Sequence, residues 1–254
     1  MTKWKKVKVH ELGRIVTGKT PKTSDRENYG GNIPFLTPSD DMSVKYVFNT
    51  GKTLTEKGKI SVKGAIIPKD SVCVSCIGSD LGKVVITTRE TVTNQQINSI
   101  VVNEKRFDRD FVYYAMLVLG KELNFHSKTS TAVPIVNKTS FSNYEIACPN
   151  IEVQKKIATI LSSFDDKIKE NEAINKNLEQ QAQALFKSWF VEFEPFNGTM
   201  PSDWEIVPLE KIADFQNGYA FKSKELLNEP SPDCYQVFKQ GHIARGGGFI
   251  PDGT

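Results

Sequence analysis

The sequence has few of the residues that build most catalytic and metal sites. Its 254 residues include four cysteines and three histidines. The histidines are too far apart in the sequence to form the His-x-x-x-His pair of a zinc-binding helix. Cys73 and Cys76 form a Cys-x-x-Cys pair, but they lie in SVCVSCI (71–77), which is typical of a buried strand, and no second pair follows. So few cysteines exclude a disulfide framework and favour a cytoplasmic protein.

Membrane spans and the common cofactor-binding motifs are also lacking. No apolar run approaches the ~20 residues of a membrane span, and the N-terminal segment has no apolar stretch like that of a signal peptide. GSDLGKV (78–84) resembles a phosphate loop, but three residues separate its glycines where the Walker pattern needs four. The Asn-Pro-Pro-Tyr and Asp-Pro-Pro-Tyr tetrapeptides of amino-methyltransferases are absent, and Asp165 and Asp166 are expected on the solvated face of a helix. We therefore predict no enzymatic activity, no metal, no cofactor bound by this chain and no membrane association.

Positive charge is concentrated in the first part of the chain. Residues 1–149 contain 22 Lys and Arg against 14 Asp and Glu, a net charge of +8. Residues 150–199 carry a net charge of −2 and residues 200–254 a net charge of −3. A basic first region suits a polyanion such as double-stranded DNA, although a merely soluble surface is the alternative.

One very long helix is predicted in the middle of the chain. Residues recur there at alternating steps of four and three, which is the heptad seam of a coiled coil. The seam consists of Ile157, Leu161, Phe164, Ile168, Asn171, Asn175, Leu178, Ala182, Leu185 and Trp189. Asn150 is expected to cap the helix, with Glu152 in its first turn. A helix over 151–190 is about 60 Å long at about 1.5 Å per residue, and its seam needs a partner helix.

The chain repeats itself at an offset of 200 residues. Six positions of the first copy match six of the second: Trp4, Val7, Val9, Leu12, Ile15 and Gly18 meet Trp204, Val207, Leu209, Ile212, Phe215 and Gly218. In each copy we expect an extended piece after the Trp and then a short apolar-faced helix, ended by the Gly in a left-handed cap. We predict three parts, namely a first domain at 1–149, a long helix at 150–196 and the start of a second, incomplete copy of the domain at 197–254.

The first domain is predicted to be mixed α and β. Segments 33–36, 71–77, 83–87 and 97–102 are typical of strands, and 110–123 of a helix. The polar loops between them are 18–31, 37–41, 78–83, 88–96 and 126–140. For any single loop an ordinary solvated turn is the better interpretation, but several such loops on a basic domain favour DNA binding. Candidate phosphate contacts are Lys19, Lys22, Lys83, Arg89 and Lys128, and candidate base contacts are Tyr29, Ser39, Asp40, Asn94, Gln95 and Thr131.

The helix and its flanks carry a family resemblance. IEVQKKIATILSSFDDKIKENEAINKNLEQQAQALFKSWFVEFEPF (151–196) closely resembles the central conserved region of the specificity subunits of type I restriction–modification systems. LGRIVTGKTP (12–21), YGGNIPFLTPSD (29–40), TNQQINSI (93–100) and MPSDWEIVPLEKIADFQNGYAF (200–221) agree with it. The resemblance implies an α+β fold, in which a mixed α/β target-recognition domain is followed by a coiled-coil-forming helix and a second copy of the domain. It also implies that two such domains each read half of a split DNA site, and that two antiparallel long helices hold them apart.

The resemblance further implies partners that perform the chemistry. Methyltransferase subunits dock on the helices, and a separate restriction subunit acts as motor and nuclease. S-adenosylmethionine, ATP and magnesium then belong to those partners, and this chain is a non-catalytic reader. Two alternatives remain: a coiled-coil adaptor that never touches DNA, and a self-sufficient methyltransferase or nuclease.

The C-terminal end of the helix is unusually aromatic. Phe186, Phe190 and Phe193 lie there beside the last seam positions, and we expect them to dock a methyltransferase subunit or to pack on the second domain copy. The seam also predicts a two-fold homodimer. Its spacing is the same in both directions, so in an antiparallel pair Asn171 faces Asn175 of the second copy.

Overall fold

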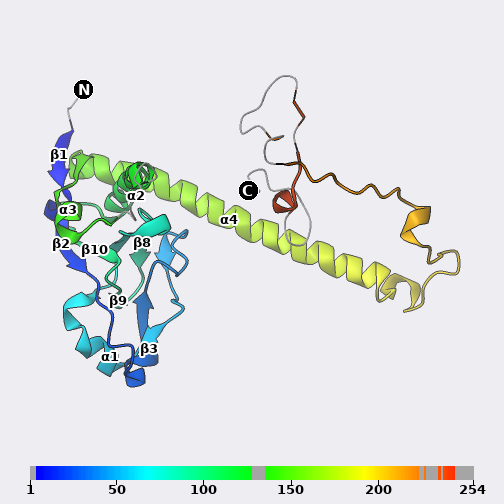
Figure 1. The fold of residues 1–254 in the computed structure, drawn as a ribbon, viewed down its shortest axis with the longest axis horizontal. Helices are drawn as coiled ribbons and strands as arrows, with labels where there is room; N and C mark the ends of the chain where they lie inside the picture. The colour runs from blue at the N-terminus through cyan, green and yellow to red at the C-terminus, as the bar shows by residue number, and fades with distance from the viewer. Residues whose placement is uncertain (1–3, 128–134, 223–225, 227–233, 236, 244–254) are drawn as a thin grey trace. The chain divides into compact units, whose positions relative to one another are not determined.

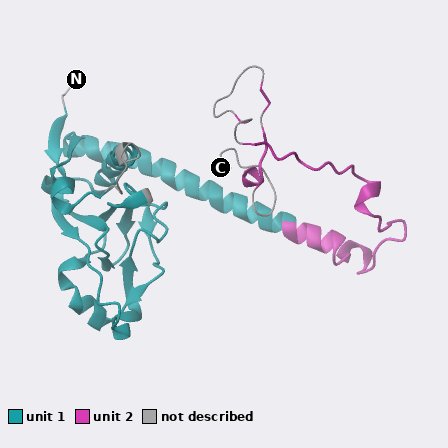
Figure 2. Ribbon diagram, viewed as in Figure 1, with its two compact units in different colours: residues 1–182 teal, residues 183–254 magenta. Residues whose placement is uncertain are grey.

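The computed structural model describes residues 4–127, 135–222, 226, 234–235 and 237–243. The chain divides into two compact units, residues 1–182 and 183–254 (Figure 2). The first unit contains the sheets and most of the long helix. The second contains the end of that helix and the segments that follow it. The predicted mixed α/β domain followed by a long helix is confirmed.

The larger sheet of the first unit has five strands. Their order is β2 (Gly13–Thr17), β10 (Ile97–Val102), β7 (Val72–Ser75), β8 (Val84–Thr87) and β4 (Tyr46–Val47). Three of the predicted strands are found here, and β10 has the predicted limits. Cys73 and Cys76 are buried in and just after β7, and burial raises the pKa of their thiols to about 12 and about 11. The Cys-x-x-Cys pair is therefore part of the core, as its strand pattern predicts.

A four-stranded sheet adjoins the larger one. Its order is β5 (Thr53–Leu54), β3 (Tyr29–Leu36), β9 (Thr91–Thr93) and β6 (Ile66–Ile67). β3 and β9 are parallel, whereas the other pairs in this sheet are antiparallel. The short helix α1 (Glu56–Ser61) begins at Thr55, whose hydroxyl accepts a hydrogen bond from the backbone N–H of Gly58.

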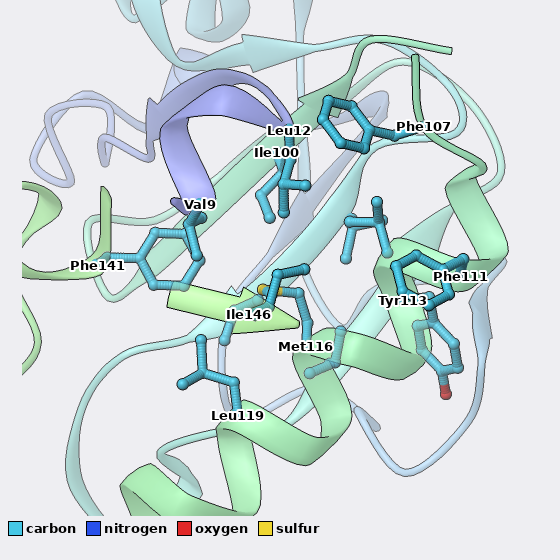
Figure 3. Close-up of a cluster of buried hydrophobic side chains, with 14 of the residues drawn as sticks. Val9, Leu12, Ile100, Phe107, Phe111, Tyr113, Met116, Leu119, Phe141 and Ile146 are labelled. Carbon is cyan, nitrogen blue, oxygen red and sulfur yellow. The ribbon is translucent and has the colours of Figure 1, made fainter. Parts of the chain in front are cut away.

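Helix α2 (Arg109–Ser127) covers the larger sheet and forms the main core with it. Figure 3 shows Met116 and Leu119 of α2 pointing towards Ile146, with Phe141 of α3 (Lys138–Asn143) and Val9 beside them. All five side chains are buried. Burying an aliphatic or aromatic side chain of this size stabilises a fold by about 1.5–3 kcal/mol, so this cluster is a main source of stability.

A two-stranded ribbon leads into the long helix. β1 (Lys5–Lys8) pairs with β11 (Glu145–Cys148), and α4 (Ile151–Phe190) begins three residues later (Figure 1). The Asn150 side chain accepts a hydrogen bond from the backbone N–H of Val153 at 3.0 Å. The predicted cap and the expected helix over 151–190 are therefore confirmed, but the helix ends before residue 196, the limit given to the long-helix part.

The expectation for the start of the repeat is partly wrong. Only residues 9–11 are helical, as the 3-10 turn η1 (Val9–Glu11), and β2 follows. Gly18 is not left-handed. A Cβ at that position would lie 2.0 Å from the carbonyl oxygen of Asn94, so glycine is required there by a close backbone approach. The second copy has the matching turn η6 (Leu209–Lys211), 200 residues after η1.

The remaining described elements are short 3-10 turns. They are η2 (Arg26–Asn28), η3 (Lys63–Ala65), η4 (Gly78–Asp80), η5 (Glu194–Phe196) and η8 (Gln240–His242). Across the described residues, no helix combines the length and the apolar character needed to cross a bilayer.

Candidate nucleic-acid interface

Parts of two predicted loops meet because strands β3 and β9 are parallel. The prediction of a loop over 88–96 was wrong at its centre, since β9 (Thr91–Thr93) lies within it. Leu36 pairs with Thr93, so the carboxyl ends of both strands lie at the same edge of the sheet. The backbone N–H of Asn94 donates to the carbonyl of Leu36 at 3.0 Å. The 37–44 and 94–96 loops therefore leave the sheet side by side.

A third loop, 18–22, joins this edge after strand β2. The backbone N–H of Lys19 donates to the carbonyl of Thr93 at 2.8 Å. The hydroxyl of Thr20 donates to the Oε1 atom of Gln95 at 2.6 Å. These two contacts fix the loop beside the carboxyl end of β9.

Two further loops reach the same edge from the larger sheet. The backbone N–H of Cys76 donates to the carbonyl of Gln96 at 2.8 Å, and that of Val136 donates to the carbonyl of Cys76 at 2.9 Å. The 76–83 and 135–137 loops are thereby tied to the others. We name these five loops the loop junction: residues 18–22, 37–44, 76–83, 94–96 and 135–137.

Three predicted contact residues of the loop junction present free polar groups. Lys19, Lys22 and Gln95 are exposed. Within the described ranges neither lysine forms an ion pair, although, besides the hydrogen bond from Lys57, the charge of Lys22 is among the causes that lower the pKa of the Asp25 carboxyl. Since Gln95 uses its oxygen for Thr20, its amide N–H groups are left to donate elsewhere. Ser39 is also exposed, with its hydroxyl 2.7 Å from that of Thr37.

Three other predicted base contacts hold the loops in shape. The Tyr29 hydroxyl donates to the carbonyl of Pro21 at 2.9 Å. The Asp40 carboxylate accepts hydrogen bonds from its own turn and from the backbone N–H of Gly51 at 2.6 Å. Asn94 is buried and bonds within its own loop. Because buried loop backbone must be satisfied internally, these side chains are occupied in the free protein.

The remaining predicted contacts are placed differently. Lys83 lies in the loop junction, but its ammonium is 2.6 Å from the Asp80 carboxylate. Arg89 precedes strand β9, so it lies at the end of that strand opposite to the junction. Lys128 and Thr131 lie outside the described residues. Nothing in the sequence indicated Thr20, whose role depends on a contact with a residue 75 positions away.

A buried polar cluster joins the first domain to helix α4, and the sequence patterns missed it. The Lys45 ammonium lies 2.8 Å from the Ser162 hydroxyl of α4 and 3.0 Å from the Tyr114 hydroxyl of α2. It also forms an ion pair with Asp110 at 3.0 Å, and only 10% of its side chain is exposed. Lys45 therefore fixes α4 against α2 through a charged group that is almost removed from solvent.

Asp165 also contacts this cluster, so its assignment to a solvated helix face holds only in part, with 38% of its side chain exposed. It accepts a hydrogen bond from the Tyr114 hydroxyl at 2.5 Å, and it lies 3.7 Å from the Lys45 ammonium. Its neighbour Asp166 is exposed and lines an open groove of about 530 Å³ between α2 and α4. In the part of the chain that the structure describes, no group of carboxylate, histidine or cysteine side chains is arranged to hold a metal ion.

The predicted seam of α4 is solvent-exposed over most of its length. Ile157 is half-buried against the core, but Phe164, Ile168, Leu178 and Leu185 are each more than half exposed. Leu161, Asn171, Asn175, Ala182 and Trp189 are also classed as exposed. An exposed and mainly apolar stripe of this kind, interrupted by Asn171 and Asn175, is typical of an interaction surface.

Aromatic side chains cluster at the C-terminal end of α4. The ring of Trp204 stacks on Phe190 at 5.6 Å and meets Phe193 and Phe196 edge-on at 6.1 and 5.5 Å. Phe186 contacts Phe190 at 5.1 Å but remains 61% exposed. We name Phe186, Trp189, Phe190, Phe193 and Phe196 the aromatic end of the helix.

The fold and its surfaces define a class of protein, a mixed α/β domain with converging polar loops that is followed by one long helix. Residues 1–180 match the family described as the type I restriction modification DNA specificity domain, and the chain belongs to this family. It is 29% identical over 259 residues to the specificity subunit of the type I restriction enzyme MjaIX from Methanocaldococcus jannaschii, covering 96% of this chain and 59% of that protein. It is 33% identical over 181 residues to the HindI specificity subunit of Haemophilus influenzae, covering 69% and 38% respectively.

A solved structure has the same fold. The S subunit of a type I restriction–modification system from M. genitalium aligns with a TM-score of 0.52 at 16% identity, over 73% of this chain and 45% of that one. The chain spans about half the length of the curated relatives that it matches.

Proposed function

We propose that this chain recognises double-stranded DNA as the non-catalytic specificity component of a type I restriction–modification complex. The observation that carries the proposal is the loop junction, where separate polar loops of a basic domain converge at one edge. Family membership supports it. In this proposal one domain reads half of a bipartite DNA site, and the long helix sets its distance from the second reader.

Within the loop junction we assign two kinds of contact. Lys19 and Lys22 bind phosphates, because their ammonium groups are exposed and no ion pair occupies them. Gln95 and Ser39 face base edges, since an exposed amide or hydroxyl can donate to the acceptors of a groove. Lys83 can bind a phosphate only if its ion pair with Asp80 breaks, so we expect it to contribute less to DNA binding than Lys19 or Lys22.

Substitution of the two free lysines tests this assignment. Lys19→Ala and Lys22→Ala are each expected to reduce the slope of log affinity against log salt concentration by about one, because each removes one phosphate contact. The measurement is fluorescence anisotropy of a labelled random-sequence duplex over a salt series. Arg89→Ala is a charge-matched control at the opposite end of β9 and is expected to leave the slope unchanged.

The outcomes separate the candidate functions. Unchanged slopes in both lysine variants would move the DNA site away from the loop junction. A wild-type chain with no salt-dependent affinity for DNA would support the alternative, a coiled-coil adaptor. Methyl transfer to DNA by the chain alone, supplied with S-adenosylmethionine, would contradict the non-catalytic role.

We further propose that catalysis belongs to partner subunits. Methyltransferase subunits would bind S-adenosylmethionine, and a restriction subunit would use ATP and magnesium. Phe186 is the main docking residue for the methyltransferase subunit, since it stays exposed while Phe190 and Phe193 hold Trp204.

Substitution of Phe186 tests the docking role. Phe186→Asp is expected to abolish co-purification with the methyltransferase subunit, because it places a charge in an apolar contact. Ile160→Asp is the matched control, as Ile160 is an exposed apolar residue of α4 far from the aromatic end. Recovery of the Phe186→Asp complex at wild-type yield would count against this role.

A further inference from the structure

The loop junction exposes two large apolar side chains among its polar ones. Ile135 is 67% exposed and Val44 is 42% exposed, whereas the other large apolar residues in the described part of the junction are buried or half-buried. Single exposed aliphatic side chains are common on protein surfaces, but these two lie at the edge where we place the DNA. A bound duplex would therefore cover both of them.

Backbone contacts hold Ile135 in a fixed position. It forms an antiparallel bridge with Ile77, and the backbone N–H of the next residue, Val136, donates to the carbonyl of Cys76 at 2.9 Å. The carbonyl of Val136 accepts a further hydrogen bond from the side chain of Asn98 in strand β10 at 3.4 Å. An exposed side chain on an anchored backbone can be covered by a ligand at a small cost in conformational entropy.

Ile135 lies near Gln95 on the same edge. Cys76 accepts a hydrogen bond from Val136 through its carbonyl and donates one to Gln96 through its backbone N–H, so the three segments run side by side. Hydrogen-bonded segments are about 4.8 Å apart, which places the backbones at Ile135 and Gln95 about 10 Å apart. Successive bases of a strand are about 3.4 Å apart. The two side chains can therefore face bases within about three base pairs of each other.

We propose that Ile135 recognises a thymine through its 5-methyl group. This inference rests on the proposed function, because it concerns the same DNA site. The methyl group of thymine is the apolar feature among the base edges of the major groove, and apolar side chains contact it there. Gln95 and Ser39 form hydrogen bonds, which do not detect a methyl group. Ile135 thus adds to the junction a contact that depends on a different chemical group of the DNA.

Replacement of thymine by uracil tests this contact, because uracil keeps the hydrogen-bonding groups of thymine and lacks the methyl. Duplexes that the wild-type chain binds are selected from a random pool, and each thymine of the enriched sequence is replaced in turn. Affinity is measured by fluorescence anisotropy at one salt concentration. One replacement is expected to weaken binding about fourfold, which corresponds to about 0.8 kcal/mol for one buried methyl group. It should lie within about three base pairs of the position whose base preference is lost in Gln95→Ala.

The isoleucine variant should remove this preference. Ile135→Ala is expected to bind the thymine and uracil duplexes with the same affinity. Ile60→Ala is the matched control and should keep the fourfold preference. Ile60 is 64% exposed in α1, and the residue before that helix, Thr55, donates its backbone N–H to Asn28 just before β3, at the end of that strand opposite to the junction. Val44→Ala should also keep the preference.

The outcomes distinguish this proposal from the proposed function. An enriched sequence without thymine, or one whose thymines all tolerate uracil, overturns the methyl contact but leaves DNA binding by the junction intact. An Ile135→Ala variant that still prefers the thymine duplex fourfold overturns the assignment to Ile135, and loss of the preference in Val44→Ala alone moves it to Val44. A wild-type chain without salt-dependent affinity for DNA overturns the proposed function and this proposal with it.

Discussion

Lys45→Met is expected to lower the free energy of unfolding by about 3 kcal/mol. The variant keeps the aliphatic stem but removes the ammonium from a cluster in which Asp110, Tyr114 and Ser162 all point at it. Breaking a buried ion pair by removing one partner typically costs about 3–5 kcal/mol, because the remaining charge is left without compensation. Arg109 still contacts Asp110 at 2.7 Å, which places the expected cost at the lower end.

Lys57→Met is the matched control for this measurement. Lys57 also has two carboxylate partners, Asp25 at 2.9 Å and Glu27 at 2.7 Å, but its side chain is largely exposed. Solvent screens such pairs, so the urea midpoint of Lys57→Met is expected to stay close to that of the wild type. Equal midpoint shifts in the two variants would contradict a special role for the Lys45 cluster.

The same cluster predicts a pH dependence. Burial alone would raise the pKa of the Asp110 carboxyl, but hydrogen bonds from Lys45 and Arg109 and their charges hold it below its ordinary value of 3.8. A carboxyl whose pKa is lower in the folded state stabilises the fold above pH 3.8, and this contribution is lost as the pH falls through the folded pKa. Lys45→Met is therefore expected to show a smaller loss of stability than the wild type below about pH 4.

The sequence predicted those helices and strands correctly whose formation depends on residues close together in the chain. The start of α4 follows from Asn150 and the first turn, because a helix cap is formed within three residues. Strand β10 has four β-branched residues among its six, Ile97, Ile100, Val101 and Val102, and it is bounded by turn residues. Strand β2 was missed, since the spacing of Leu12 and Ile15 suits a short helix as well as a turn followed by a strand.

Contacts between distant residues were beyond the sequence patterns. Lys45 and Ser162 are 117 positions apart, and neither lies in a motif that indicates the other. Asp165 was placed on a solvated face because its position relative to α2 depends on how the whole domain packs. Such a cluster becomes visible only when the tertiary fold is known.

The DNA-contact residues of the candidate site could be predicted only in part, for a different reason. Polar loop residues were chosen by type, but the same types also satisfy the backbone of a packed loop. Asp40 and Asn94 are engaged within the loops, whereas Lys19 and Gln95 point outward from the same junction. Residue type predicts where DNA contacts could occur, and the hydrogen bonds of the folded loops decide which side chains are free.

Asn171→Leu with Asn175→Leu is expected to tighten the helix pair strongly. In the antiparallel register Asn171 of each chain faces Asn175 of the other chain. The pair therefore buries four asparagine side chains, and the double variant replaces all four by leucines. Burying a leucine instead of a polar group contributes roughly 1.5 kcal/mol or more, so the dissociation constant is expected to fall by at least about a hundredfold. Asn177→Leu is the matched control, because Asn177 is an exposed residue of the same helix outside the seam.

The same substitutions are expected to loosen the register of the pair. Buried asparagines disfavour shifted registers, in which an amide faces leucine or isoleucine, and leucines remove that penalty. In a Cys234→Ser background, which removes the exposed native cysteine, a chain with Ile168→Cys and one with Leu178→Cys should form a mixed disulfide across the antiparallel pair. The Asn-to-Leu variant should lower the yield of that bond or change the stoichiometry in sedimentation equilibrium. A dominant disulfide between two Ile168→Cys chains would indicate parallel helices and would contradict the predicted antiparallel pair.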